Sequence, residues 1–125
     1  MTQFLSFGEI MLRLKTPGHQ RFFQSHEFEA TFGGGEANVA VALSNYGLGS
    51  GFVSALPDND IGENAIMELR KFGVDTAHVS RSGDRVGIYF LEAGSNQRPS
   101  KVVYDRANSS ICNASADEFD WPSIF

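Results

Sequence analysis

The sequence contains one cysteine, no long apolar run and no cluster of basic residues. With Cys112 alone, no disulfide can form within the chain, which favours a reducing compartment and a cytoplasmic location. No stretch approaches the roughly 18 apolar residues that a membrane helix needs, and the N-terminus lacks the features of a signal peptide. A net charge of −5 without a basic patch disfavours nucleic acids and anionic membranes as partners.

The composition nevertheless supports a small packed core. Of the 125 residues, 42% are hydrophobic and 11 are phenylalanine, which is typical of a globular domain. The histidines His19, His26 and His78 have spacings that build no metal site. Cys112 has no evident base or cationic neighbour, so we expect a buried small residue there.

The first half of the chain alternates predicted strands and helices. The predicted elements are a buried strand over 4–14, a helix over 36–46, a strand over 50–56 and a helix over 60–72. Gly8-Glu9 marks a bend in the first strand, and Asp60 with Glu63 resembles a capping box at the second helix. This order is typical of an α/β fold with a parallel sheet and crossover helices.

The second half changes to a β-hairpin. Residues 85–93 and 101–106 read as two strands around a polar turn, and a turn centred on Asn96-Gln97 places Tyr89 opposite Tyr104. An earlier segment, 26–32, alternates polar and apolar residues and predicts a half-exposed strand. Three aromatic residues in the last seven have no later strand to cover, so we expect the chain to be part of a longer one.

A glycine-rich turn precedes the first helix and is the first candidate site. In Gly33-Gly34-Gly35-Glu36-Ala37-Asn38 the glycines let the backbone approach a ligand, and the helix N-terminus supplies free N–H donors. The stretch is equally compatible with a tight strand-to-helix turn. It matches neither the P-loop nor the dinucleotide pattern, and the 125 residues contain no recognisable ATP site.

The hairpin supplies a second candidate site. Tyr104 and Arg106 project from the same face of their strand, close to Tyr89. Two phenols and a guanidinium could hold a polyol that carries a carboxylate, with the arginine binding the acid through two N–H groups. The pattern alone favours a simpler interpretation, a cross-strand aromatic pair beside a surface arginine.

Taken together, these motifs resemble the ribokinase-like (phosphofructokinase-B type) carbohydrate kinases. The similarity covers nearly the whole chain, through segments 7–9, 33–43, 57–62 and 72–75. Within the family, the likeness is greatest to 2-keto-3-deoxygluconate kinases, and it rests on Glu36, Gly87-Ile88-Tyr89 and Val103-Tyr104-Asp105-Arg106.

The resemblance implies a three-layer α/β/α sandwich with a small β lid, whose strands would lie roughly within 10–33 and 85–107. Residues 1–125 would be the N-terminal part of a single kinase domain whose nucleotide-binding part is absent. The whole protein would transfer the γ-phosphoryl group of ATP, with Mg²⁺, to the terminal hydroxyl of 2-keto-3-deoxygluconate. A homo-oligomer formed through the lid is a further expectation.

The same likeness implies a set of substrate-binding residues. Gly34, Gly35 and Asn38 would bind sugar hydroxyls; Tyr89, Tyr104 and Arg106 would hold the keto-acid end, and Glu9 would line the pocket. No catalytic residue can be assigned in this chain, because the residues for phosphoryl transfer belong to the later half of the family's sequence.

Three other interpretations remain open. The protein could be another kinase of the family, such as a fructokinase, which has no need of Arg106 against a carboxylate. It could be a non-catalytic sugar-acid-binding module, supported by the missing nucleotide motif. An NAD-dependent enzyme is disfavoured, because no dinucleotide fingerprint follows the first strand.

Overall fold

The structure is a computed structural model, and it describes residues 2–95 and 97–125. In chain order its elements are β1 (Phe4–Phe7), β2 (Met11–Lys15), β3 (Glu29–Gly33), α1 (Gly35–Asn45), β4 (Ser50–Val53), β5 (Ala55–Leu56), α2 (Asp60–Lys71), β6 (Ser80–Arg81), β7 (Ile88–Glu92), β8 (Lys101–Asp105), α3 (Ser110–Asn113), the short 3-10 helix η1 (Ala116–Glu118) and α4 (Trp121–Ile124). No helix in these two ranges is long and apolar enough to cross a membrane.

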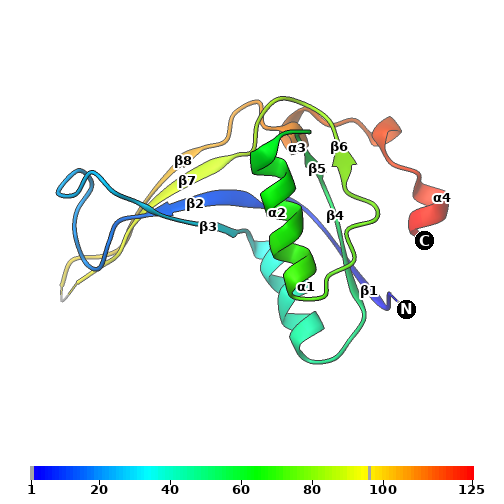
Figure 1. Cartoon of the computed structure of the whole chain (residues 1–125), viewed down its shortest axis with the longest axis horizontal. Coiled ribbons are helices and arrows are strands. Elements are labelled where there is room, and N and C mark those ends of the chain that lie inside the picture. The colour runs from blue at the N-terminus through cyan, green and yellow to red at the C-terminus, as the bar shows by residue number, and fades with distance from the viewer. Residues whose placement is uncertain (1, 96) are drawn as a thin grey trace.

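The core lies between short parallel strands and two helices. Strand β1 pairs in parallel with β4, and β5 pairs in parallel with β6. Helices α1 and α2 lie side by side against these strands (Figure 1). Ala40 of α1 and Ala65 of α2 are buried in one cluster with Leu69 of α2 and with Phe52 and Leu56 of the strands. The small alanines let the helices approach the large strand residues closely. The predicted strand–helix alternation is confirmed.

The predicted bend at Gly8-Glu9 is confirmed, but the prediction of one buried strand over 4–14 is otherwise wrong. The chain bends at Gly8–Ile10 and divides the segment into β1 and β2, which belong to different sheets. Strand β1 is also largely exposed, with Phe4 at 46% and Phe7 at 53%. Among the described residues β1 pairs with β4 alone. The ring of Phe7 is partly covered by the rings of Phe119 and Trp121.

Four strands form a second sheet, which we call the projecting sheet, in the order β3-β2-β7-β8. It extends away from the two helices (Figure 1). Strand β2 pairs antiparallel with β3 and parallel with β7, and β7 forms a hairpin with β8. The hairpin prediction is confirmed, and Tyr89 does lie opposite Tyr104. Of the predicted turn centre, Asn96 lies outside the described residues.

Two smaller predictions need correction. The second helix is capped by Asn59, whose side chain accepts a hydrogen bond from the Gly62 N–H at 2.9 Å, and not by a box formed from Asp60 and Glu63. The carboxylate of Glu63 instead pairs with Arg81 at 2.9 Å. Cys112 is exposed rather than buried, because it lies on the single-turn helix α3 at the surface.

A buried ion pair holds the tip of the projecting sheet together. Glu92, at 6% exposure, pairs with Arg98 at 3.5 Å and accepts a hydrogen bond from the Phe22 N–H at 3.1 Å. Arg98 also donates to the carbonyls of His19 and Ala93. The loop before β3 is therefore tied to the β7–β8 turn, although about 75 residues separate them in the sequence.

We predict that Arg98→Met destabilises the longer chain by about 2–3 kcal/mol, because it leaves the carboxylate of Glu92 buried without its cation. The free energy of unfolding in urea measures the change. Lys15→Met is the matched control: it removes the partner of Glu29, which is 61% exposed, and is expected to cost less than about 0.5 kcal/mol. Equal costs for the two variants would contradict a structural role for the buried pair.

Candidate functional site

A hollow of about 210 Å³ lies between the glycine-rich turn and the projecting sheet. It is lined by Met11, Gly34, Gly35, Asn38, Tyr89, Val102 and Tyr104. Five of the seven predicted binding residues are therefore brought together, from two parts of the chain that are about 50 residues apart. The other two, Glu9 and Arg106, form a pair next to Tyr104.

Two of the three glycines of the turn lie in close contacts. A Cβ atom at Gly34 would lie 2.3 Å from the carbonyl oxygen of Glu9, and one at Gly33 would lie 2.7 Å from the Tyr89 hydroxyl oxygen. Gly35, by contrast, has no atom within 4 Å of such a Cβ, so its backbone faces open space. Gly33 and Gly34 thus allow neighbouring atoms to pack closely, whereas Gly35 leaves open space at the start of α1.

Helix α1 begins at this turn and carries Asn38 in its first turn. The Asn38 N–H donates to the Gly34 carbonyl at 2.8 Å, which commits that backbone donor to the helix. The side chain of Asn38 lines the hollow, where its amide can both donate and accept hydrogen bonds. The two interpretations of the turn are therefore compatible: it is a tight connection, and it also presents polar groups to a cavity.

The tyrosines form one wall of the hollow. Tyr89 and Tyr104 are directly opposite each other on β7 and β8, with ring centroids 6.1 Å apart and planes inclined by 41°. The simpler interpretation, a cross-strand aromatic pair, is therefore correct. Because Tyr104 is 58% exposed and both rings border the hollow, the pair is also accessible to a ligand.

Arg106 follows β8 and is held from two sides. Its guanidinium carbon lies 4.7 Å from the Tyr104 ring centroid, and its Nη1 lies 3.5 Å from Glu9 Oε1. The Arg106 side chain is 50% exposed, whereas that of Glu9 is only 15% exposed. The Ser109 hydroxyl donates to Glu9 Oε2 at 3.1 Å. The carboxylate of Glu9 is therefore engaged by protein groups, and Arg106 keeps an exposed edge.

Sequence reasoning did not single out Met11, Val102 or Ser109. Alternation along the predicted strands could have found the first two, because Met11 and Val102 lie on the same sheet face as Tyr89. Ser109 carried no such signal, since its bond to Glu9 spans 100 residues.

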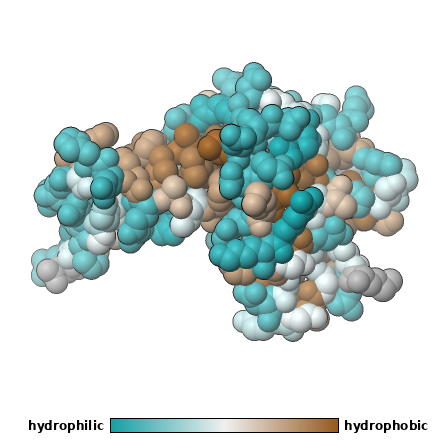
Figure 2. Space-filling view, viewed as in Figure 1, coloured by the Kyte–Doolittle hydropathy of each residue, from teal (hydrophilic) through white to brown (hydrophobic). Residues whose placement is uncertain are grey.

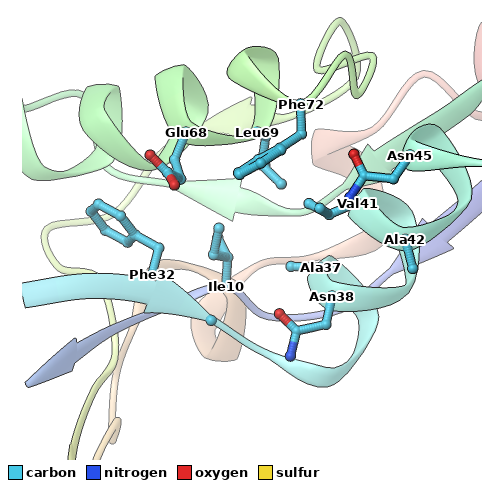
Figure 3. A pocket seen from close by; sticks show the side chains of 11 residues that line it. Ile10, Phe32, Ala37, Asn38, Val41, Ala42, Asn45, Glu68, Leu69 and Phe72 are labelled. Atoms are coloured by element: carbon cyan, nitrogen blue, oxygen red, sulfur yellow. The ribbon is translucent and has the colours of Figure 1, made fainter. Parts of the chain in front are cut away.

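A second hollow, of about 240 Å³, lies between α1 and α2 and is seen in Figure 3. Ile10 and Val41 contribute apolar surface to it, and Asn45 and Glu68 contribute polar groups from the two helices. Asn38 lines this hollow as well as the first. The side chains that lie around it are mostly apolar, which suits it less well to a polyhydroxy ligand.

Two carboxylates with lowered pKa values, Asp75 and Glu118, lie outside both hollows. The pKa of Asp75 is lowered because its carboxylate accepts a hydrogen bond from the Ala77 N–H and another from Thr2. The pKa of Glu118 is lowered by hydrogen bonds from the Ser82 side chain and the Ser115 N–H. Among the residues that the structure describes, no three His, Cys, Asp or Glu side chains form a group that could hold a metal.

The close contacts of the turn predict different responses at neighbouring glycines. Gly34→Ala should lower the free energy of unfolding by about 1–3 kcal/mol, because the new methyl group collides with the Glu9 carbonyl. Gly35→Ala is the matched control and should change it by less than about 0.5 kcal/mol, since its methyl group enters open space. Denaturant unfolding of the longer chain measures both. A Gly34→Ala protein as stable as the control would show that the contact is not tight.

Comparisons with known proteins give a consistent result. The model of the pfkB family carbohydrate kinases matches residues 1–124. A 2-dehydro-3-deoxygalactonokinase of Haloferax volcanii is 37% identical over 93% of this chain and 36% of its own length.

Solved structures agree with the sequence comparison. The crystal structure of 2-dehydro-3-deoxygluconokinase from Thermotoga maritima is 54% identical, with a TM-score of 0.96 over 99% of this chain and 38% of that one. An uncharacterized sugar kinase from Pyrococcus horikoshii, solved in complex with ATP, is 25% identical with a TM-score of 0.86 over 97% and 39%. The chain thus spans little more than a third of the length of these relatives. The predicted ribokinase-like α/β fold is confirmed, and the chain belongs to the pfkB family of carbohydrate kinases.

Proposed function

We propose that the whole protein transfers the γ-phosphoryl group of ATP to the terminal hydroxyl of 2-keto-3-deoxygluconate, also called 2-dehydro-3-deoxygluconate. The observation that carries the proposal is the position of two phenols and a guanidinium opposite the glycine-rich turn. Family membership supports the kinase activity. The names of the relatives described above, a 2-dehydro-3-deoxygalactonokinase and a 2-dehydro-3-deoxygluconokinase, support an acidic sugar as the acceptor.

The two walls of the hollow have complementary chemistry for such a substrate. The backbone at Gly34 and Gly35 and the amide of Asn38 would bind sugar hydroxyls. The hydroxyls of Tyr89 and Tyr104 would bind near the keto-acid end, and the exposed edge of Arg106 would take the carboxylate through its planar N–H groups. Glu9 would contribute by holding Arg106 against the Tyr104 ring.

The residues of this chain would bind and orient the acceptor, and we assign no step of the transfer to them. Phosphoryl transfer requires bound Mg²⁺, cradled phosphates and an oriented hydroxyl. The described residues lack an acidic cluster for the metal, so the residues that hold ATP and Mg²⁺ are expected elsewhere in the protein. A cytoplasmic location, where ATP is available, agrees with the single unpaired cysteine, Cys112.

The direct test is ADP release by the full-length protein with MgATP and one acceptor at a time. The acceptors are 2-keto-3-deoxygluconate, 2-keto-3-deoxygalactonate and fructose. Preference for a keto acid over fructose supports the proposal, and the ratio between the two acids reports the stereochemistry. Preference for fructose would overturn the acid specificity and keep the kinase, whereas binding of the acid without turnover would favour a non-catalytic module.

Arg106→Leu should raise the KM for 2-keto-3-deoxygluconate by roughly 10- to 100-fold, because a charge-assisted hydrogen bond to the carboxylate is lost. The use of fructose, where measurable, should change far less. Arg85→Leu is the matched control, since Arg85 also pairs with a carboxylate at the base of β8, that of Asp105 at 3.1 Å. Of the two arginines, Arg106 is the one that packs over the ring of Tyr104, a residue that lines the hollow. Steady-state kinetics of both variants decide the question, and equal losses for acid and neutral sugar would contradict the carboxylate role.

We further propose that two copies pair through the apolar face of the projecting sheet. A hollow of about 250 Å³ on this face is lined only by apolar residues, namely Phe22, Phe23, Phe28, Phe90 and Val103. Phe23 is 77% exposed and Val103 is 44% exposed. Figure 2 shows apolar surface along the projecting sheet, between its polar tip and the helices. An exposed patch of this kind is typical of a protein–protein interface.

Val103→Glu should therefore convert a dimer of the full-length protein to a monomer, because it buries an unpaired charge in the interface. Val39→Glu is the control, since Val39 is similarly exposed, at 51%, but lies on α1. Light scattering coupled to size-exclusion chromatography measures the mass of each. A monomeric parent protein, or a Val103→Glu protein that remains dimeric, would rule out this interface.

A further inference from the structure

A second arginine lies on the face of the projecting sheet that carries the tyrosine pair. Arg13 is in the middle of β2, in register with Tyr89 of β7 on one side and with Thr31 of β3 on the other. Residues in register project from the same face of a sheet, with Cβ atoms about 5 Å apart. Arg13 is therefore a direct neighbour of Tyr89.

The position of Arg13 also follows from the residue two places before it. Met11 and Arg13 project from the same face because side chains alternate along a strand. Met11 and Tyr89 both line the hollow of the candidate site. Arg13 thus has a lining residue next to it along its own strand and another across the sheet, so its long side chain starts at the border of the hollow.

The charges on this face do not balance. Lys15 is paired with Glu29 at 3.9 Å, and Arg106 is paired with Glu9 at 3.5 Å. Arg13 forms no ion pair and no side-chain hydrogen bond with any residue in the described ranges, 2–95 and 97–125, although it is partly buried on a central strand. Of the three cations on this face, Arg13 alone has a charge that no carboxylate offsets.

We propose that Arg13 is a specificity-determining residue that supplies the uncompensated positive charge for the carboxylate of the substrate. The inference rests on the proposed function, that the acceptor is a sugar acid, and it adds a residue to that site. The guanidinium of Arg106 orients the acid by its hydrogen bonds, but its charge is opposed by Glu9. An anion is attracted more strongly by a lone charge than by a neutral pair, because the two fields of the pair partly cancel.

The competing explanation is that Arg13 is a solvated surface residue of the sheet. The two explanations differ in what they predict for a charged and a neutral ligand of the same shape. A residue that attracts the carboxylate affects only the acid, whereas a residue that supports the sheet affects both ligands. The amide of the substrate, 2-keto-3-deoxygluconamide, provides the neutral ligand.

The experiment uses the full-length protein and the variants Arg13→Gln and Lys15→Gln. For Arg13→Gln, we expect the KM for 2-keto-3-deoxygluconate to rise roughly 10- to 100-fold while kcat changes little. The KM for the amide should stay within about twofold. Lys15→Gln is the matched control on the same strand and face, and it should leave both KM values nearly unchanged, because Glu29 already offsets the charge of Lys15.

Arg13→Lys tests the chemistry of the interaction. It keeps the charge and loses the planar fork, so it should recover part of the affinity for the acid. Thermal unfolding midpoints of all variants report whether the sheet is intact. If Arg13→Gln and Lys15→Gln behave alike, or if Arg13→Gln weakens acid and amide equally, the inference is wrong.

Failure of the proposed function is distinguished from failure of the Arg13 inference by the behaviour of the unmodified protein. If the unmodified protein does not prefer the acid to its amide, the acid specificity itself is wrong, whatever the Arg13 variants do. If it binds the acid but does not phosphorylate it, calorimetric titration with the acid and the amide replaces the kinetic assay. The Kd values of Arg13→Gln then decide on Arg13 by the same comparison.

Discussion

The arrangement of the site depends on one close contact between two backbone segments. At Gly34 the chain passes so near the Glu9 carbonyl that a Cβ atom would lie 2.3 Å from its oxygen. The contact joins the turn before α1 to the bend that leads from β1 into β2. Because β2 is a central strand of the projecting sheet, this bend sets where the whole sheet stands relative to α1. The absence of a side chain at one position thus brings the two walls of the hollow together.

Strand alternation then gives the projecting sheet two faces with different chemistry. One face carries Tyr89 and Tyr104, with Arg13 beside Tyr89, and it borders the hollow. The other carries Phe90 and Val103, which are adjacent to the tyrosines in sequence, and its middle is apolar. A shift of one residue in the pairing would exchange the faces, so the register that places the tyrosines in the site also leaves the apolar surface outside it. The proposed binding face and the proposed assembly face are therefore both set by the same strand pairing.

The sequence was informative where the cause of a structure is local. Glycine stops and apolar periodicity identified α1 and α2, and hairpin symmetry identified the Tyr89–Tyr104 pair. Sequence-based prediction failed where a feature depends on residues that are far away in the sequence. The exposure of β1 could not be read from its own apolar residues, because burial depends on which strands lie beside it. The partners of Glu9 were also out of reach, since Arg106 and Ser109 follow it by about 100 residues.

The base of the projecting sheet is where its position relative to α1 is decided. Three chain segments cross there: the bend at Glu9, the residue before β7 and the residues after β8. A Cβ atom at Gly87 would lie 2.5 Å from Glu9 Oε2 and 2.9 Å from the Cβ atom of Arg106, so the crossing is tightly packed. The strands beyond these segments are joined by continuous hydrogen bonding, so the sheet is connected to the rest of the chain through these segments and through the turn at Gly34. Glu9 and Arg106 lie at this crossing and beside the hollow, so under the proposed function the carboxylate of the substrate would bind next to the segments that set the position of the sheet.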